Sequence, residues 1–140
     1  MQPGIATGDA VCVVDCGTAI TIDLVDPVGR HRGGLILAGV SLMQQALCAQ
    51  TAELQLPRGD QPPPVLLANA TATAISSGCR YAAAAAIDRI TEDMAAGAGL
   101  QPVVVLTGGE ANTVAPLLRV AARHDADLVL KGIAILAGGN

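Results

Sequence analysis

The chain has 140 residues, 51% of them apolar and 14% charged, and this composition excludes an intrinsically disordered protein. The net charge of −4 and the single aromatic residue, Tyr81, exclude a basic groove or a base-stacking platform for nucleic acid. No uninterrupted apolar run reaches the length of a membrane span, and residues 1–10 lack the cationic start of a signal peptide. We therefore expect a cytoplasmic protein without a membrane partner.

The first third of the sequence predicts three consecutive strands. Residues 11–14 form a β-branched run, and residues 20–24 alternate between apolar and polar side chains. Residues 26–29 predict a turn, after which residues 32–37 predict a third strand. This strand contains Gly33 and Gly34, so either a β-bulge or the close approach of a ligand is expected there.

The helical pattern begins at Ser41, which we expect to be an N-cap. A proline-rich connection at residues 55–64 should be exposed. From about Asn69, apolar residues recur at three- and four-residue steps as far as Gly97 and Gly99, which predicts one long helix capped by Asn69 or Thr71.

The last third predicts a buried strand at 103–106, a helix at 110–123, a short strand at 127–130 and a final helix at 132–137. The order β-β-β-α-α-β-α-β-α predicts one α/β domain with a mixed five-stranded sheet over residues 11–140. Residues 1–10 are expected to be a tail or the remnant of a linker.

The four cysteines are expected to be reduced thiols. Cys12 and Cys16 would lie about 13 Å apart in an extended strand, which is too far for a disulfide. No Cys-x-x-Cys pair is present, and neither histidine falls at zinc-ligand spacing from a cysteine.

Asp15-Cys16-Gly17-Thr18 is the first candidate site. Gly17 would let backbone amides approach a phosphate and Thr18 would supply a hydroxyl donor. Asp15 would repel a phosphate unless a metal ion or ammonium lay between them, so a bridging cation is implied. The alternative is a β-turn in which Asp15 accepts hydrogen bonds from local amides.

Thr107-Gly108-Gly109-Glu110 is the second candidate. A strand that ends in two glycines before a helix exposes free amides that suit a phosphate or a ribose. A tight strand-to-helix connection would explain the same pattern. Asp23 and Asp26 are most simply exposed residues of a strand and a turn.

These elements together resemble the type III pantothenate kinases, the family that includes the Bvg accessory factor proteins. The specific block is "VVDCGTAITIDLVDPVGRHRGGLILAG", residues 13–39. The weaker blocks "TAELQLP", "NATATAISSG", "TGGEA" and "DLVLKGI" follow in the family's order. The resemblance covers nearly the whole chain, from about residue 11 to residue 135.

The resemblance implies a ribonuclease-H-like domain, one half of an actin-like ATPase fold, with a mixed five-stranded sheet and helices on both faces. It implies the ATP-dependent phosphorylation of pantothenate, the first step of coenzyme A synthesis, with K⁺ or NH₄⁺ and Mg²⁺. Asp15 matches the cation-binding aspartate and Thr71 a pantothenate-contacting threonine. Gly17, Thr18, Gly108 and Gly109 match the ATP-contacting positions, and a homodimer is expected.

Two family elements are missing from the sequence. The family begins with an Asp-x-Gly-Asn-Thr phosphate loop and carries a Gly-x-Asp-Arg segment with the expected general base and a substrate-binding arginine, and neither is found. Ala38 also stands where the family usually has proline. We therefore expect the C-terminal half of the enzyme, which supplies the cation and ATP side, contains no catalytic base, needs the N-terminal half and is inactive alone.

Two other functions fit parts of the sequence. Asp15-Cys16-Gly17-Thr18-Ala19 is similar to the catalytic turn of aspartic proteases, which could be completed in a dimer. The alanine-rich helix argues against that nearly all-β fold. The other alternative is a non-catalytic domain that binds a nucleotide or a partner and regulates.

Overall fold

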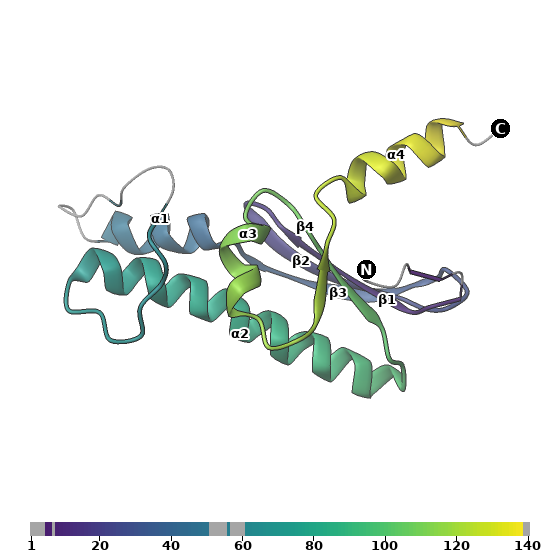
Figure 1. Ribbon diagram of the computed structural model, residues 1–140, viewed down its shortest axis with the longest axis horizontal. Coiled ribbons are helices and arrows are strands. Elements are labelled where there is room, and N and C mark those ends of the chain that lie inside the picture. The colour runs from purple at the N-terminus through teal and green to yellow at the C-terminus, as the bar shows by residue number, and fades with distance from the viewer. Residues whose placement is uncertain (1–4, 7, 51–55, 57–60, 139–140) are drawn as a thin grey trace.

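Five strands form one mixed sheet in the order β3-β2-β1-β4-β5 (Figure 1). The computed structural model describes residues 5–6, 8–50, 56 and 61–138. β1, β2 and β3 form the expected antiparallel meander, while β4 and β5 run parallel to β1. The strands are β1 Val11–Cys16, β2 Ala19–Val25, β3 His31–Ala38, β4 Val103–Thr107 and β5 Ala122–His124.

The helices of the described residues lie on the two sides of this sheet. α1 and α2 run side by side in opposite directions, and α2 passes beneath the strands (Figure 1). α4 projects on the other side and away from the sheet. The helices are α1 Val40–Gln50, α2 Thr71–Ala98, α3 Ala111–Val114 with the 3₁₀ turn η1 Ala115–Leu117, and α4 Leu128–Gly138.

The aliphatic core lies between α2 and one face of the sheet. Alternation along β1 and β2 sends every second side chain into this core, because successive residues of a strand point to opposite faces. α2 contributes Ala83, Ala84 and Ile87, and the two alanines let its backbone approach the strands closely. The buried strand residues of this face are Cys12, Val14, Cys16, Ile20, Ile22, Leu24, Val104 and Leu106.

We call the opposite side of the sheet the open face. By the strand registers it carries Val11, Val13, Asp15, Ala19, Thr21, Asp23, Val25, Gly34, Ile36, Ala38, Val103, Val105, Thr107 and Arg123. α1, α2 and α3 do not cover this face (Figure 1).

The predicted α/β fold with a mixed five-stranded sheet is confirmed, and the ribonuclease-H-like class is consistent with it. The expected helices do lie on both sides, although α4 buries none of its residues. The aspartic protease reading is wrong, because α2 alone has 28 residues, a fifth of the chain.

Two predictions for the last third are wrong. The helix expected at 110–123 ends at Leu117, because Pro116 lacks an amide hydrogen and the chain then turns into β5. The strand expected at 127–130 is instead the start of α4. A short apolar run such as "DLVL" fits a buried strand and a helix equally well, so its pattern alone could not decide.

The expected helix caps are also wrong. α1 begins at Val40, which places Ser41 inside the first turn. α2 is preceded by Ala70 and has no side-chain cap, so neither Asn69 nor Thr71 serves as one. Half of the connection predicted at 55–64, residue 55 and residues 57–60, lies outside the described residues. Its described end, 61–64, is partly exposed.

The glycine pair of β3 accompanies a β-bulge. The register shifts between Leu24 and Val25, opposite Gly33, which has a φ of +118°. A side chain at Gly34 would collide with Asp23 and with the carbonyl of Ile22. The bulge alternative is therefore confirmed, and the close neighbour of Gly34 is the adjacent strand.

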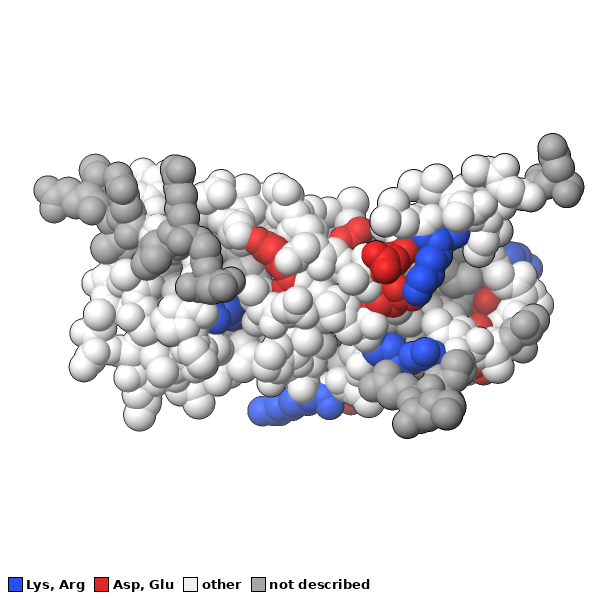
Figure 2. All heavy atoms as spheres, turned by 45° about the horizontal axis from the view of Figure 1, so that its top comes forward, with Lys and Arg blue, Asp and Glu red and all other residues white. Residues whose placement is uncertain are grey.

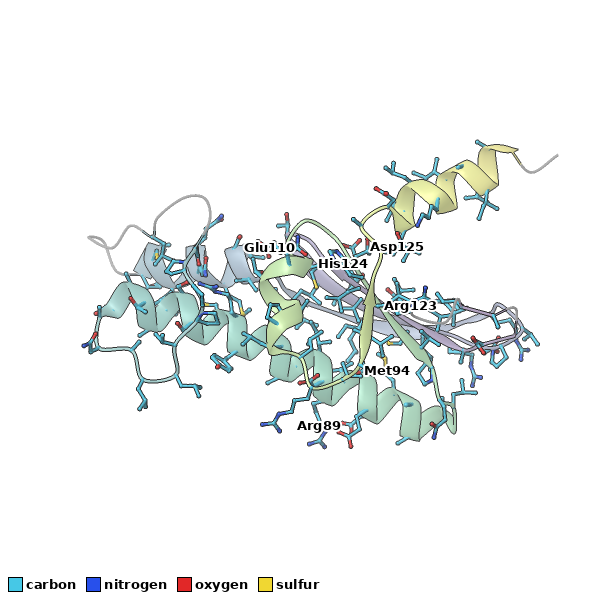
Figure 3. All side chains as sticks on the ribbon, viewed as in Figure 1. Arg89, Met94, Glu110, Arg123, His124 and Asp125 are labelled. Carbon is cyan, nitrogen blue, oxygen red and sulfur yellow. The ribbon has the colours of Figure 1, made fainter. Side chains whose placement is uncertain are left out.

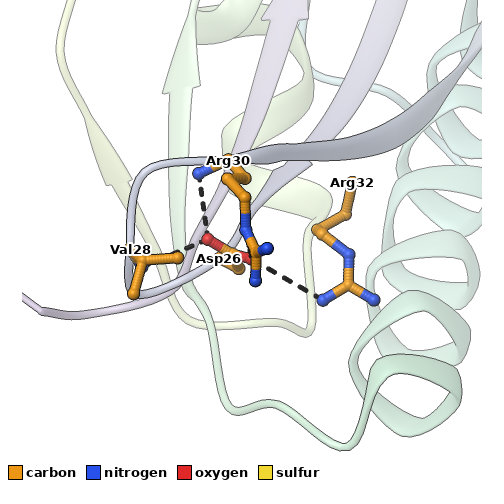
Figure 4. Close-up of polar contacts among 4 residues, drawn as sticks. All are labelled: Asp26, Val28, Arg30 and Arg32. Carbon is orange, nitrogen blue, oxygen red and sulfur yellow. Dashed lines mark hydrogen bonds and ion pairs between the residues drawn. The ribbon is translucent and has the colours of Figure 1, made fainter.

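Asp26 is buried, with only 4% of its surface exposed, although the sequence predicted an exposed turn residue. Its carboxylate accepts hydrogen bonds from the amides of Val28 and Arg30 at 3.1 and 2.9 Å (Figure 4). The Arg30 Nε donates at 3.1 Å, and an Arg32 nitrogen lies 3.7 Å away. The Arg30 amide is the largest cause that lowers the pKa of Asp26. These donors close the turn between β2 and β3.

The thiols of Cys12, Cys16 and Cys79 are buried in the core. Burial raises the pKa of Cys12 and of Cys16 to about 11, so both are protonated at neutral pH, in line with the expected reduced core thiols. Among the described helices, none combines the length and apolar character needed to span a bilayer.

Candidate functional site

Three connections meet at the end of the sheet where β1 and β4 finish. The β1–β2 turn bonds to the start of α1, because the Gly39 amide donates to the Thr18 carbonyl at 2.9 Å. The β4–α3 turn bonds to the end of β1, because the Glu110 amide donates to the Cys16 carbonyl at 2.8 Å. We call this group the strand-end cluster: Asp15, Gly17, Thr18, Gly39, Ser41, Thr107, Gly108, Gly109 and Glu110.

The two sequence candidates are thereby brought together. Asp15 and Thr107 are paired residues of the parallel strands β1 and β4, so the turns that follow them lie next to each other. Gly17 and Gly108 are half-buried, whereas Thr18 and Gly109 are exposed.

The Asp15 carboxylate accepts no hydrogen bond and forms no ion pair within the residues that the structure describes. The β1–β2 turn is closed instead by its backbone, with the Gly17 amide donating to the Ala19 carbonyl at 3.0 Å. Asp15 is half-buried on the open face. The β-turn alternative, with Asp15 bonding local amides, is therefore not observed in the described chain.

Asp15 lies in a row of three oxygen-bearing side chains on the open face. Thr21 of β2 pairs with it on one side and Thr107 of β4 on the other. Thr107 is buried and Thr21 is half-buried. One carboxylate between two hydroxyls is a donor set that suits a hard cation such as K⁺ or Mg²⁺.

Gly108 packs directly beside this carboxylate, a contact that a residue with a side chain could not make. Its φ is +94°, and a Cβ at this position would lie 2.5 Å from the Asp15 Oδ1 and 2.6 Å from the Cys16 carbonyl oxygen. Gly109 differs, since a Cβ there would meet no atom within 4 Å. The first glycine of the pair is thus required by geometry, and the second is not.

Glu110 connects the β4–α3 turn to the first turn of α1 (Figure 3). Its carboxylate accepts from the Ser41 amide at 3.3 and 3.4 Å and also from the Ser41 hydroxyl. A carboxylate beside the first amides of a helix is stabilised by the helix dipole. Glu110 therefore joins the β4–α3 connection to the β3–α1 connection through a side-chain contact.

The buried thiol of Cys16 lies behind both carboxylates. After burial, the charges of Asp15 and Glu110 are the further causes that raise its pKa to about 11. The thiol is consequently protonated at neutral pH, and a protonated thiol is a poor nucleophile.

Thr71 is not part of the strand-end cluster. It is the exposed first residue of α2, and α2 begins at the far end of α1 from the cluster (Figure 1). Within the described residues, no group of three or more His, Cys, Asp or Glu side chains could hold a metal. A cation site here would depend on one carboxylate supplemented by hydroxyl and carbonyl oxygens.

Sequence reasoning missed Thr21 and the contact between Ser41 and Glu110. Thr21 could have been found, because a hairpin turn after Cys16 places it across from Asp15. The Ser41 contact joins residues 69 positions apart. No local pattern reports such a contact.

A family model for type III pantothenate kinases matches residues 4–93 of the chain. The chain belongs to the type III pantothenate kinase family. It is 42% identical over 128 residues to the type III pantothenate kinase of Nitrosococcus oceani and 39% identical over 133 residues to that of an Azoarcus species. The resemblance of the chain to this family is thereby confirmed.

The chain spans about half the length of the curated relatives it matches. The alignments cover 91% and 95% of the chain but only 48% and 49% of the relatives from Nitrosococcus and Azoarcus. A solved structure from Campylobacter jejuni, described as a conserved Baf family transcriptional activator, superposes with a TM-score of 0.61 at 25% identity. That match covers 94% of this chain and 60% of the Campylobacter chain. The chain thus corresponds to the C-terminal half of such a kinase.

Proposed function

We propose that this chain supplies the cation and ATP side of a pantothenate kinase, with the strand-end cluster as the place where the ATP phosphates bind. The observation that carries the proposal is the Asp15 carboxylate, which has no bonding partner in the described chain and lies between two threonines beside Gly108. A structural aspartate at the end of a strand would be bonded as Asp26 is.

The residues of the cluster fit a phosphate with a bridging cation. Asp15, with the neighbouring hydroxyls and carbonyl oxygens, would hold K⁺ or NH₄⁺. The amides of the Gly108–Gly109 turn and the Thr18 hydroxyl would donate to phosphate oxygens, while Gly17, whose amide is bonded to Ala19, would let the phosphate approach the β1–β2 turn closely. When bound, the cation neutralises charge on the phosphates, with Mg²⁺ accompanying ATP.

The transfer itself requires residues outside this sequence. No general base for the pantothenate hydroxyl is assigned to this chain, so we propose that the N-terminal half of the enzyme supplies it together with the first phosphate loop. Thr71 would contact pantothenate from a position separate from the cluster, in a pocket completed by a second subunit of a homodimer. The complete enzyme would act in the cytoplasm.

Titration calorimetry with ATP tests the site in this chain alone. We expect weak binding that strengthens when K⁺ or NH₄⁺ replaces a large organic cation, because the bridging position needs a small monovalent ion. Asp15→Ala should weaken binding about tenfold, the size of one charge-assisted contact, and abolish the dependence on K⁺.

Asp23→Ala is the matched control. Asp23 lies on the same open face and bonds to His31 at 2.7 Å, away from the strand-end cluster. Its removal changes the net charge equally and should leave ATP affinity unchanged. Binding of ATP by the wild type that ignores K⁺, or equal losses in the two variants, would contradict the proposed role of Asp15.

A non-catalytic regulatory domain is the second candidate function. It is favoured by the absence of an assigned base and by the Campylobacter structure, whose description as a transcriptional activator concerns that protein. Pantothenate-dependent ADP formation by this chain mixed with an N-terminal half from a relative would distinguish the two. A regulator would form no ADP even when both halves are folded.

A further inference from the structure

A groove with a volume of about 1140 Å³ lies beside the second half of α2. Its lining comes from α2 between residues 81 and 96, from the α2–β4 connection at 99–102 and from the η1–β5 connection between residues 117 and 120. The η1–β5 connection passes beside the middle of α2 (Figure 1). We call this feature the α2 groove. Sites for small organic ligands have volumes of about 300–1,000 Å³, so the α2 groove is large enough for one.

Small side chains on one side and an irregular connection on the other leave room for the groove. Ala84, Ala85 and Ala95 of α2 line it at positions where longer side chains would occupy the same volume. Opposite them, Pro116 ends the helical stretch after β4, and Leu118 is already extended. Part of the alanine run of α2 therefore borders the groove and not another helix.

The α2 groove has an aliphatic floor. Ala84 of α2 and Val104 of β4 are buried there, and Leu100, Leu117 and Val120 are half-buried. All five belong to the hydrophobic core or pack against it, so the groove opens directly onto the core. A hydrocarbon chain laid on this floor would remove apolar surface from water.

Asp88 fixes the edge of the groove that the η1–β5 connection forms. Its carboxylate accepts hydrogen bonds from the Arg119 amide at 3.0 Å and from the Val120 amide at 2.9 Å. These contacts occupy the Asp88 oxygens and hold the backbone of Arg119 in one place. They use only the amide of Arg119, so its side chain takes no part in them.

Arg119 carries the positive charge that is available at this edge. Its exposed guanidinium forms no hydrogen bond or ion pair with any residue that the structure describes. The other arginine of the lining, Arg89, instead donates from Nε to Asp93 at 2.7 Å. Over the sheet, basic and acidic side chains likewise lie next to each other (Figure 2), as in the 2.8 Å pair of Lys131 and Asp125. Arg119 differs from these residues in having no carboxylate partner in the described chain.

The remaining charges limit what Arg119 can bind. A guanidinium pairs best with a carboxylate or a phosphate, through two parallel hydrogen bonds. Asp88 and the exposed Glu92 also line the groove, so a dianionic phosphate would be repelled more strongly than a carboxylate with one charge. An aliphatic floor beside one available guanidinium therefore fits a singly charged carboxylate on a hydrocarbon chain.

We propose that the α2 groove binds a small aliphatic monocarboxylate, with its hydrocarbon chain on the floor and its carboxylate paired with Arg119. The site is separate from the strand-end cluster. The floor belongs to the side of the sheet that α2 covers, whereas Asp15 lies on the open face. The proposal adds a second ligand to this chain and does not depend on the binding of ATP.

Titration with octanoate, followed by the backbone amide resonances of the isotope-labelled chain, tests the proposal. We expect saturable shifts at residues 81–104 and 117–120 and none at the strand-end cluster. Hexanoate should bind about tenfold more weakly, because two fewer methylenes lie on the floor. Octylammonium, which has the same chain length and the opposite charge, should also bind at least about tenfold more weakly than octanoate.

Two pairs of variants locate the ligand. Arg119→Gln should weaken octanoate binding about tenfold, whereas Arg89→Gln removes the same charge from an arginine already paired with Asp93 and should leave the affinity unchanged. Ala85→Leu should fill the groove and abolish binding. Ala82→Leu is its control, because it adds the same side chain to another exposed position of α2 that does not line the groove.

Several results would overturn the proposal: no saturable binding of octanoate, equal affinity for octylammonium, or equal losses within either pair of variants. Shifts confined to the exposed apolar residues of α4 would overturn it as well, because octanoate would then bind hydrophobic surface elsewhere. Circular dichroism verifies that the four variants retain their helix content. Asp15→Ala should leave octanoate binding unchanged, so failure of the ATP site and failure of the α2 groove are distinguishable.

Discussion

The two ends of the sheet each carry an aspartate at the point where a strand enters a turn. Asp26, at the β2–β3 end, is buried and accepts hydrogen bonds from two amides and the Arg30 side chain (Figure 4). Asp15, at the β1–β2 end, accepts none from the described chain, and its turn is closed by the backbone of Gly17 and Ala19. Both residues are followed by a glycine within three positions, so their sequence contexts look alike.

This comparison shows that the hydrogen-bond donors around a carboxylate distinguish a structural aspartate from one that is available to a ligand. Donors from its own turn satisfy Asp26, and loss of this carboxylate would leave the amides of Val28 and Arg30 without their acceptor. The neighbours of Asp15 are Thr21, Thr107 and the tightly packed Gly108, none of which donates a hydrogen bond to it in the described chain. A carboxylate held half-buried without local donors costs free energy, which a cation recovers.

Replacing the turn aspartate should have the largest effect on folding. Asp26→Ala removes a buried carboxylate that accepts from three donors of the β2–β3 turn, so we expect the melting temperature to fall by several degrees. Asp15→Ala should change it far less. Thermal unfolding followed by circular dichroism compares the two. A larger loss for Asp15→Ala would reverse the comparison.

The stabilisation that Asp26 provides should depend on pH. The folded pKa of Asp26 is lowered, first by the Arg30 amide, so its contribution is complete above the unfolded pKa of about 3.9 and is lost as the pH falls through the folded value. The stability gap between wild type and Asp26→Ala should therefore be full at neutral pH and shrink on acidification below about pH 4. Denaturant unfolding at several pH values measures it, and a gap independent of pH would contradict the assignment.

A methyl group beside Asp15 should have an intermediate effect. Gly108→Ala places a Cβ 2.5 Å from the Asp15 Oδ1 at a positive φ, so we expect a loss of about 1–3 kcal/mol in the free energy of unfolding and weaker ATP binding. Gly109→Ala is the matched control, since nothing lies within 4 Å of its added carbon. Equal behaviour of the two alanine variants in urea unfolding would show that the first glycine is not required.

The smallest effect is expected at the contact between Glu110 and α1. Glu110→Gln removes the charge beside the Ser41 amide and should cost about 0.3–1 kcal/mol, the usual contribution of a carboxylate at a helix start. A double-mutant cycle with Ser41→Ala measures the coupling. Glu92→Gln, at an exposed position of α2, serves as the control for loss of one negative charge. Additive effects in the cycle would mean that the two residues do not stabilise each other.

Much of the fold was predictable because its determinants are local. The alternation of apolar and polar residues predicted β1 and β2, and the helical periodicity of apolar residues predicted α2. The N-cap of α2 could not be predicted, because Ala70 has no side-chain oxygen. The last third was mispredicted where Pro116 ended a helix early and where the apolar residues after Asp127 fitted both a strand and a helix. Short apolar runs contain too few periods to distinguish the two structures.

The sequence by itself determined the α/β class, the aliphatic core, the meander and the family, and it marked the Asp15 and Gly108 segments as candidates, because each depends on residue types at short spacing. Only the tertiary structure decided that these two segments meet, that Asp26 is bonded within the described chain while Asp15 is not, and that α4 buries none of its residues. These facts depend on strand order and on contacts between residues far apart in the chain. No pattern within a short window encodes such contacts, since the folded backbone alone sets which distant segments become neighbours.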